Sequence, residues 1–188
     1  MSKFKQLTNV SDIEELRKNI SLLNEQQRRF FDDFTERFAS HDVNERPVYV
    51  FLAGNAGTGK SFLLKILIEA VKFIKIKGGD ELQKPPVLVT APTATAAFII
   101  GGKTIDSALG FLPNDRNKYN QISSSKLLMM RHQFEDLSLL VCDEISMVGA
   151  SKLLKINFRL QDLFEGTRRQ EYMAGISFLA SGKQNLLF

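Results

Sequence analysis

Residues 48–61 read VYVFLAGNAGTGKS, and this stretch decides the fold. Its first seven residues form a continuous apolar run of the kind that is typical of a strand covered on both faces in a parallel sheet. A glycine-rich loop follows, and then the apolar residues of SFLLKILIEAVKFIKIK recur at helical spacing to about Lys77. The order of strand, loop and helix predicts an α/β unit with the loop at the carboxyl end of the strand.

The loop matches the pattern G-x-x-x-x-G-K-[ST] at every defined position. Glycines can take positive φ angles, so backbone N–H groups can converge on the phosphates of a triphosphate at the start of a helix. Lys60 is predicted to contact the β- and γ-phosphates and to act in catalysis, and the Ser61 hydroxyl to bind Mg²⁺. The predicted nucleotide contacts in this loop are Gly54, Asn55, Ala56, Gly57, Thr58, Gly59, Lys60 and Ser61.

Further apolar runs are predicted to be strands of the same sheet. They are VLVTA (87–91), LSLLVCDE (137–144) and GISFLAS (175–181). A short helix is expected to start at Thr93 or Thr95, and residues 113–133 read as a loop plus one helix. Strands that alternate with helical crossovers predict an α/β fold, with a three-layer parallel sheet and helices on both faces.

Two helices are predicted before the first strand. Ser11 is expected to start a short amphipathic helix, and Asn24 is a good N-cap for the second helix. Phenylalanines at helical spacing in the second helix are expected to face the core. They are Phe30, Phe31, Phe34 and Phe38. We assign residues 1–22 to a polar N-terminal extension and residues 23–188 to one nucleotide-binding domain.

An acid pair, Asp143 and Glu144, ends the third predicted strand. Ligands of parallel sheets sit beyond the carboxyl ends of the strands, so this pair is expected at the same edge as the glycine-rich loop. Asp143 is predicted to hold Mg²⁺ through water, and Glu144 to orient and deprotonate the attacking water. The second acid favours ATP hydrolysis over a GTPase-like switch. Cys142 is expected to be an inert core residue.

The composition is that of a single globular domain with 188 residues and a formal charge of +4. This charge is compatible with a polyanionic partner but does not require one. A single cysteine excludes an internal disulfide and favours a reducing compartment. Since no apolar run approaches the roughly 18–20 residues of a membrane span, we expect no membrane partner and a nuclear or cytoplasmic location, with a mitochondrial one left open.

Longer blocks around these motifs carry a resemblance to a known family. The blocks GNAGTGKS, VLVTAPTATAAFIIGGKTIDSALGF and LLVCDEISMVGASKLLKINFRLQ occur in this order between about Leu23 and Ser181. They resemble the first motor domain of the Pif (petite integration frequency) DNA helicases of superfamily one. The resemblance implies a RecA-like P-loop NTPase fold, ATP hydrolysis with Mg²⁺, and 5′-to-3′ DNA unwinding in repair, recombination and telomere maintenance.

The resemblance also implies roles for individual residues. Gln27 is the candidate for reading the adenine base, with Gln26 as the alternative. Asp106 stands where the family commonly has histidine, which places a negative charge near the expected DNA path. The candidate contacts to single-stranded DNA, or to the strand at a duplex junction, are Thr90, Pro92, Thr93, Ala94, Lys103 and Thr104. For these residues an ordinary helix-capping loop is the other interpretation, and Asn157 and Arg159 are taken as structural support.

After its last predicted strand the chain departs from the family, because Lys183 stands at the position of a coupling aspartate. In the family a second motor domain supplies an arginine finger and half of the DNA groove. We therefore expect this chain to be the front half of a motor, with weak DNA binding and weak ATP turnover unless a second domain acts in trans. Two other hypotheses are a non-catalytic, nucleotide-dependent interaction module and a small-molecule kinase. Such kinases usually have a lid rich in arginine, and the only hint of one here is the segment 167–169.

Overall fold

The computed structural model describes residues 10–40, 46–55, 57–77, 82–112 and 119–183. Its first part contains α1 (Val10–Ser21), α2 (Glu25–Ala39), β1 (Tyr49–Ala53), α3 (Lys60–Lys77), β2 (Val87–Ala91), α4 (Ala94–Ile100), β3 (Lys103–Thr104) and α5 (Ile105–Leu109). Its second part contains α6 (Ser124–Gln133), β4 (Leu139–Cys142), η2 (Ile145–Met147), α7 (Ala150–Leu163), η3 (Gly166–Gln170), η4 (Tyr172–Gly175) and β5 (Ser177–Gly182). The described strands form one parallel sheet in the order β1-β5-β4-β2-β3.

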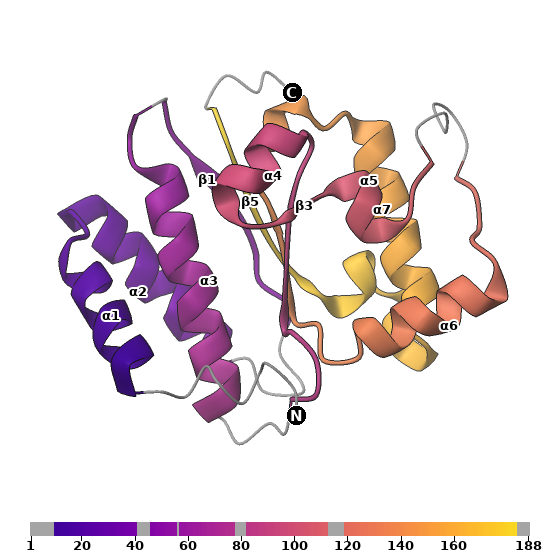
Figure 1. The fold of residues 1–188 in the computed structure, drawn as a ribbon, viewed down its shortest axis with the longest axis horizontal. Helices are drawn as coiled ribbons and strands as arrows, with labels where there is room; N and C mark the ends of the chain where they lie inside the picture. Colours follow the sequence, from indigo (N-terminus) through magenta and orange to yellow (C-terminus); the bar gives the residue numbers. More distant parts are fainter. Residues whose placement is uncertain (1–9, 41–45, 56, 78–81, 113–118, 184–188) are drawn as a thin grey trace.

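Helices cover both faces of the sheet, as Figure 1 shows with α1, α2 and α3 on one side and α5, α6 and α7 on the other. Alternate residues of a strand point to opposite faces, and β4 supplies both layers in this way. Leu139 and Val141 pack with α2 and α3, whereas Leu140 and Cys142 pack with α5, α6 and α7. The predicted three-layer α/β fold is confirmed.

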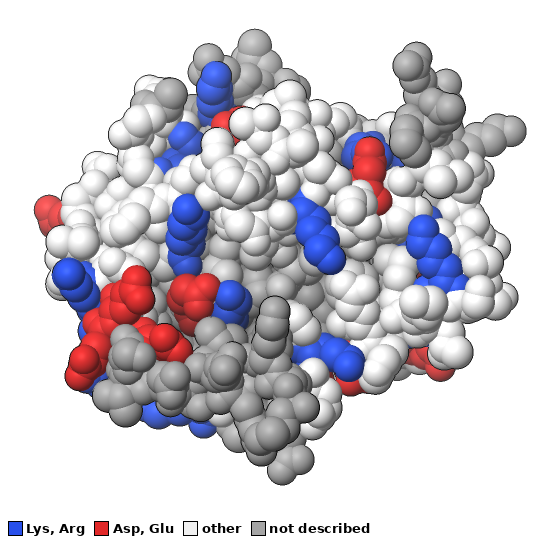
Figure 2. All heavy atoms as spheres, viewed as in Figure 1, with Lys and Arg blue, Asp and Glu red and all other residues white. Residues whose placement is uncertain are grey.

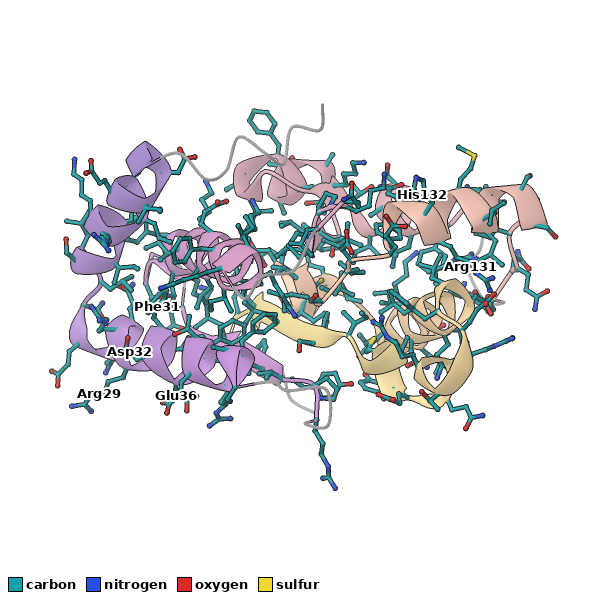
Figure 3. All side chains as sticks on the ribbon, turned by 90° about the horizontal axis from the view of Figure 1, so that it is seen from below. Arg29, Phe31, Asp32, Glu36, Arg131 and His132 are labelled. Atoms are coloured by element: carbon teal, nitrogen blue, oxygen red, sulfur yellow. The ribbon has the colours of Figure 1, made fainter. Side chains whose placement is uncertain are left out.

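Helix α2 is fixed at its start by a capping box and along its length by phenylalanines. The Asn24 side chain accepts from the Gln27 amide at 2.9 Å, and the Gln27 side chain accepts from the Asn24 amide at 3.1 Å. Phe31 points into the protein in Figure 3, while Arg29 and Glu36 point away from it. Of the predicted stripe, Phe31, Phe34 and Phe38 are buried and Phe30 is partly buried. The prediction for this helix is confirmed.

Strand β1 differs from its prediction because it lies at the edge of the sheet. Tyr49 is 44% exposed and Phe51 is 40% exposed, so the expected coverage of both faces is wrong for this strand. Alternate residues such as Leu52 are buried against α3, and the Tyr49 ring meets the Tyr172 ring edge-on at 5.4 Å. The layer of α5, α6 and α7 covers the inner strands and leaves this face of β1 partly open.

Other boundaries shifted by small amounts. Helix α1 begins at Val10, so Ser11 lies inside its first turn and is not the residue before it. Helix α4 begins after Thr93, the first of the two predicted starts. The short strand β3 was not predicted, and it lies so close to β2 that a Cβ on Gly102 would be 2.5 Å from the Val89 carbonyl oxygen.

Cys142 is an inert core residue, as expected. It is fully buried, and burial raises the pKa of its thiol to about 12, so the reactive thiolate is not formed at neutral pH. Within the described ranges, no helix combines the length and the apolar character that crossing a bilayer requires.

Candidate functional site

The predicted site residues meet at the carboxyl edge of the sheet. The glycine-rich loop follows β1 and the acid pair follows β4, and these two strands lie on either side of β5. The Gly54 amide donates to the Gly182 carbonyl at 3.3 Å, and the Ser181 hydroxyl donates to the Asp143 carboxylate. The end of β5 therefore joins the two halves of the site, and the acid pair lies at the predicted edge.

Lys60 lies across the loop that precedes it. Its ammonium group donates to the carbonyl oxygens of Gly54 and Asn55, both at 2.7 Å. The Thr58 hydroxyl donates to the Asn55 carbonyl at 2.9 Å and closes the turn. An ammonium group has three donors, so Lys60 can bind an anion while part of this network persists. Ala56, predicted to contact nucleotide, lies outside the described residues.

Gln27 contacts the same loop from the start of α2. Its side-chain nitrogen donates to the Thr58 carbonyl at 3.1 Å, while its oxygen accepts from Asn24 in the capping box. Gly59 has a φ of +79°, and a Cβ there would lie 2.6 Å from the Gln27 nitrogen. The positive φ favours glycine at this position, and a Cβ there would also displace the end of the Gln27 side chain from the loop. Gln26 is exposed, so the structure brings Gln27 rather than Gln26 to the loop.

Asp143 is 6% exposed and its hydrogen bonds give it a defined orientation. Its Oδ1 accepts from the Glu144 amide at 3.0 Å and from the Ser181 hydroxyl. Glu144 has φ 55° and ψ 41°, a left-handed conformation that is uncommon outside glycine and costs free energy. This turn leaves the Glu144 side chain half-buried at the sheet edge, where a catalytic carboxylate would be useful.

The donor set fits Mg²⁺ held jointly by protein and nucleotide. Mg²⁺ prefers oxygen ligands and is commonly bound by one or two carboxylates together with phosphates and waters. Asp143 supplies a carboxylate after β4, and Ser61 supplies a hydroxyl after β1, two strands of this edge that are separated by β5. Among the described residues there is no cluster of three or more His, Cys, Asp or Glu that could hold a metal by itself.

The candidate DNA contacts lie on the segments that follow β2 and α4, apart from Thr90, which lies within β2. The Thr93 hydroxyl caps α4 by accepting from the Ala96 amide, and the Thr104 hydroxyl caps α5 by accepting from the Ser107 amide, both at 3.2 Å. The helix-capping interpretation is thus correct for both threonines, although a hydroxyl that accepts can still donate. The exposed members of the set are Ala94 and Lys103, with Pro92, Thr93 and Thr104 partly exposed.

Thr90 corrects the sequence-based prediction of a DNA contact. It is only 1% exposed, and its hydroxyl donates to the Val141 carbonyl at 2.7 Å inside the sheet. Helices α4 and α5 contact β2 and the Thr90 hydroxyl bonds to β4, so this side chain is not available to a nucleic acid. Its carbonyl instead accepts from the Asp143 amide at 3.0 Å, and Thr90 supports the acid pair.

The negative charge of Asp106 has a counter-charge in the structure. Its carboxylate pairs with Lys152 at the start of α7, and the Lys152 ammonium lies 4.8 Å from the centre of the Phe111 ring. Figure 2 shows acidic side chains gathered over α1 and the adjacent part of α3, while Lys and Arg are scattered singly over that face. The net positive charge is therefore not concentrated in one stripe on this face.

The two residues taken as structural support on α7 are both buried. The Asn157 side chain accepts from the Met173 amide at 2.7 Å, and Arg159 donates to the Asn120 carbonyl at 3.0 Å. The Arg159 guanidinium also lies between the rings of Phe111 and Tyr119, about 5 Å from each centre. These contacts tie α7 to its neighbours and confirm the structural interpretation.

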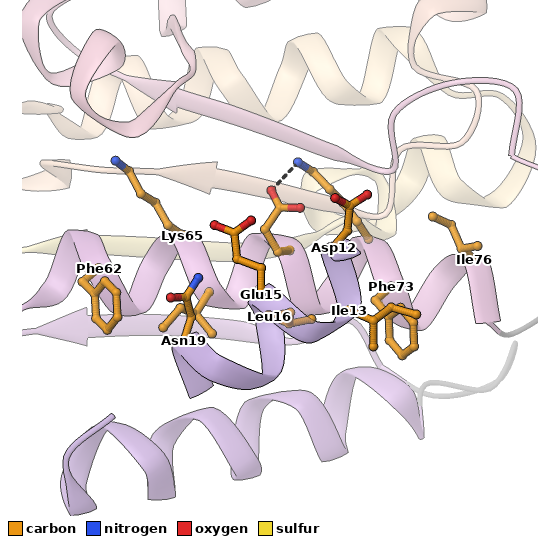
Figure 4. A pocket seen from close by; sticks show the side chains of 12 residues that line it. Asp12, Ile13, Glu15, Leu16, Asn19, Phe62, Lys65, Phe73 and Ile76 are labelled. Carbon is orange, nitrogen blue, oxygen red and sulfur yellow. Dashed lines mark hydrogen bonds and ion pairs between the residues drawn. The ribbon is translucent and has the colours of Figure 1, made fainter. Parts of the chain in front are cut away.

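A separate cavity of about 310 Å³ lies between α1 and α3, as Figure 4 shows. Its lining mixes apolar and charged side chains, with an ion pair between Glu69 and Lys72. The lining residues are Asp12, Ile13, Glu15, Leu16, Asn19, Phe62, Lys65, Ile66, Glu69, Lys72, Phe73 and Ile76. None of them belongs to the predicted nucleotide or DNA set, so the cavity is not the candidate site.

Sequence reasoning missed Ser181. Its hydroxyl is fully buried and bonded to Asp143, whereas the apolar pattern of residues 175–181 predicted only a buried strand. A hydroxyl at the end of an otherwise apolar strand is a usable signal, because a buried hydroxyl needs a hydrogen-bond partner.

Comparisons with known proteins place this chain beside one family of helicases. A family model described as PIF1-like helicase matches residues 22–185. The ATP-dependent DNA helicase PIF1 of Saccharomyces cerevisiae is 39% identical over 112 residues, which are 58% of this chain and 12% of that protein. The ATP-dependent DNA helicase Pif1 of Campylobacter jejuni is 36% identical over 120 residues, which are 60% of this chain and 25% of that protein.

Solved structures of Pif1 helicases have the same fold over most of this chain. The Pif1 helicase from Candida albicans has a TM-score of 0.63 at 28% identity and covers 86% of this chain. The Bacteroides Pif1 helicase in complex with ADP-AlF3 and single-stranded DNA has a TM-score of 0.57 at 28% identity and also covers 86%. The chain spans 32% of the length of each of these two solved proteins.

Proposed function

We propose, because the chain belongs to the PIF1-like helicase family, that it works as the ATP-binding motor domain of a DNA helicase. One observation carries the proposal: the end of β5 joins the glycine-rich loop and Asp143 at one edge of the sheet. This arrangement can hold the phosphates of a triphosphate at the loop and its Mg²⁺ at Asp143. The relatives described above are DNA helicases, which favours a motor over the kinase and interaction-module hypotheses.

For the nucleotide we propose ATP with Mg²⁺. The glycine-rich loop and Lys60 would surround the phosphates, and Ser61 and Asp143 would hold the cation, which neutralises charge on the phosphates. Glu144 is the candidate general base, because a carboxylate near the γ-phosphate can accept the proton of the attacking water. An arginine from a second motor domain, in the same longer protein or in trans, would add about 10³–10⁵ in rate.

For the DNA we propose that the segments after β2 and α4 meet the backbone of a single strand. Pro92, Thr93 and Ala94 offer compact side chains that let a phosphate approach closely. Lys103 and Thr104 on β3 pair with the last two residues of β2, which immediately precede this segment. Lys103 supplies positive charge at an exposed position. Helicases act where DNA is, so we propose a nuclear or cytoplasmic location, with a mitochondrial one still open.

Replacing Lys103 by alanine is expected to weaken binding of a labelled oligothymidine and to lower the salt dependence of that binding by about one unit of slope. Each neutralised phosphate releases condensed counterions, so the loss of one contact removes one such term. The measurement is fluorescence anisotropy over a series of salt concentrations, with and without Mg²⁺-ATP.

Lys77→Ala is the matched control for Lys103→Ala. Lys77 is also exposed, but it lies at the far end of α3, roughly 27 Å along the helix from the glycine-rich loop. Its replacement should leave the slope unchanged. If both variants changed the slope equally, the change would reflect the net charge of the protein, and the DNA contact would not be at Lys103.

Replacing Gln27 by alanine is expected to bring the affinities for ATP and GTP close to each other. An amide can pair in a bidentate way with the edge of adenine, and alanine cannot. Competition against a fluorescent nucleotide measures both dissociation constants. Gln26→Ala should keep the preference for ATP, and a loss of preference in that variant instead would transfer the adenine-reading role to Gln26.

A further inference from the structure

The end of β5 contains a buried hydroxyl to which the proposed function gives no role in binding the cation. All six residues of β5 are buried, and Ser181 is 0% exposed. A hydroxyl moved from water into the interior costs free energy unless it finds a partner. The partner of Ser181 is the carboxylate of Asp143, the candidate ligand of Mg²⁺.

The hydrogen bonds of the Asp143 carboxylate are unevenly divided between its two oxygens. Oδ1 accepts from the Ser181 hydroxyl and also from the Glu144 amide at 3.0 Å. Two donors on one oxygen fix the rotation of the carboxylate about its χ2 angle. They also leave Oδ2 as the oxygen that can face a cation or the water bound to it.

The same end of β5 also positions the phosphate side of the site. In the parallel pairing, Leu52 lies beside Ser181 and Ala53 beside Gly182, and the Gly54 amide then donates to the Gly182 carbonyl at 3.3 Å. Ser181 and Gly182 therefore link the phosphate loop to Asp143 through adjacent residues. A change in the orientation of the phosphate loop would therefore shift Asp143, and a change at Asp143 would shift the loop.

We propose that Ser181 is a positioning residue for Mg²⁺, which holds Asp143 so that Oδ2 faces the cation of a bound nucleotide. The proposal rests on the proposed function, since it assumes that Mg²⁺-nucleotide binds at this edge. Groups that orient a metal ligand commonly contribute about 10–100-fold to metal affinity. Ser181 should accordingly affect binding of nucleotide with Mg²⁺ and have little effect on binding without it.

The test measures the dissociation constant of ATPγS by calorimetry, once with Mg²⁺ and once with EDTA. Ser181→Ala is expected to weaken binding about tenfold or more in Mg²⁺ and to leave binding in EDTA unchanged. Ser181→Thr keeps the hydroxyl and should keep the gain from Mg²⁺, even though an added methyl group in this buried place lowers the melting temperature. Comparison of the two variants separates the role of the hydroxyl from that of packing.

Ser177→Ala is the matched control on the same strand. Ser177 is 2% exposed, and its hydroxyl accepts from the Val48 amide at 3.0 Å at the other end of β5. The Ser177→Ala variant should be less stable, but Mg²⁺ should still increase its affinity for ATPγS. The positioning role is overturned if Ser181→Ala binds as the unsubstituted chain does, or weakens equally in Mg²⁺ and EDTA. If the unsubstituted chain itself binds no ATPγS, the proposed function fails, and this proposal fails with it.

Discussion

Replacing Lys60 by alanine is expected to abolish the rise in melting temperature that Mg²⁺-ATP gives to the unsubstituted chain. At a ligand concentration of 100 times its dissociation constant, binding stabilises the folded state by about 2.7 kcal/mol. For a chain of this size, that corresponds to a rise of roughly 5–10 °C. Alanine removes the ammonium group that would meet the β- and γ-phosphates, so the rise should vanish.

The Lys60 variant must be compared with itself, with and without nucleotide. The ammonium group of Lys60 also donates to the carbonyls of Gly54 and Asn55, so the variant can differ in stability before any ligand is added. Lys65→Ala is the control, since Lys65 is an exposed lysine on the same helix. It should keep the full rise. If Mg²⁺-ATP still raised the melting temperature of the Lys60→Ala protein, the assignment of residues 54–61 as a phosphate loop would be wrong.

Features that depend on local sequence patterns were predictable. The loop at residues 54–61, the capping residue Asn24 and the strand at residues 87–91 are each encoded within a few neighbouring positions. Apolar periodicity and turn chemistry act over such short distances, so one sequence is enough to recognise them. The three-layer fold followed from the alternation of these elements.

Features that depend on the order of strands were not predictable in the same way. The exposure of β1 and the burial of Thr90 both follow from which strands become neighbours in the sheet. An apolar run looks the same in a sequence whether it ends at the edge or in the middle. Thr90 likewise looks like an accessible polar residue until β3 and β4 are placed beside it.

The contacts that organise the candidate site are also long-range. Gln27 meets Thr58 over a separation of 31 residues, and Ser181 meets Asp143 over a separation of 38. The resemblance pointed to Gln27 but not to its bond with the loop, because that bond needs α2 to pack beside α3. The contact between Gln27 and the glycine-rich loop therefore depends on the packing of α2.

Replacing Phe34 by alanine is expected to lower the free energy of unfolding by about 3–5 kcal/mol. Phe34 is 1% exposed, and its ring stacks with Phe30 and Phe38 at centre distances of 6.5 and 5.9 Å. The loss is a large part of the roughly 5–15 kcal/mol that stabilises a typical domain. Urea unfolding followed by circular dichroism measures the free energy and shows whether the slope stays constant.

Phe98→Ala is the same chemical change at an exposed position, because Phe98 on α4 is 87% exposed. It should change the free energy of unfolding by no more than about 0.5 kcal/mol. Phe34→Ala should also weaken ATP selectivity in the protein that remains folded, without denaturant, because a loosened α2 no longer holds Gln27 against Thr58. If Phe34→Ala lowered the free energy of unfolding no more than the small amount expected for Phe98→Ala, α2 would not pack against α3 in solution. The argument that α2 positions Gln27 at the glycine-rich loop would then be wrong.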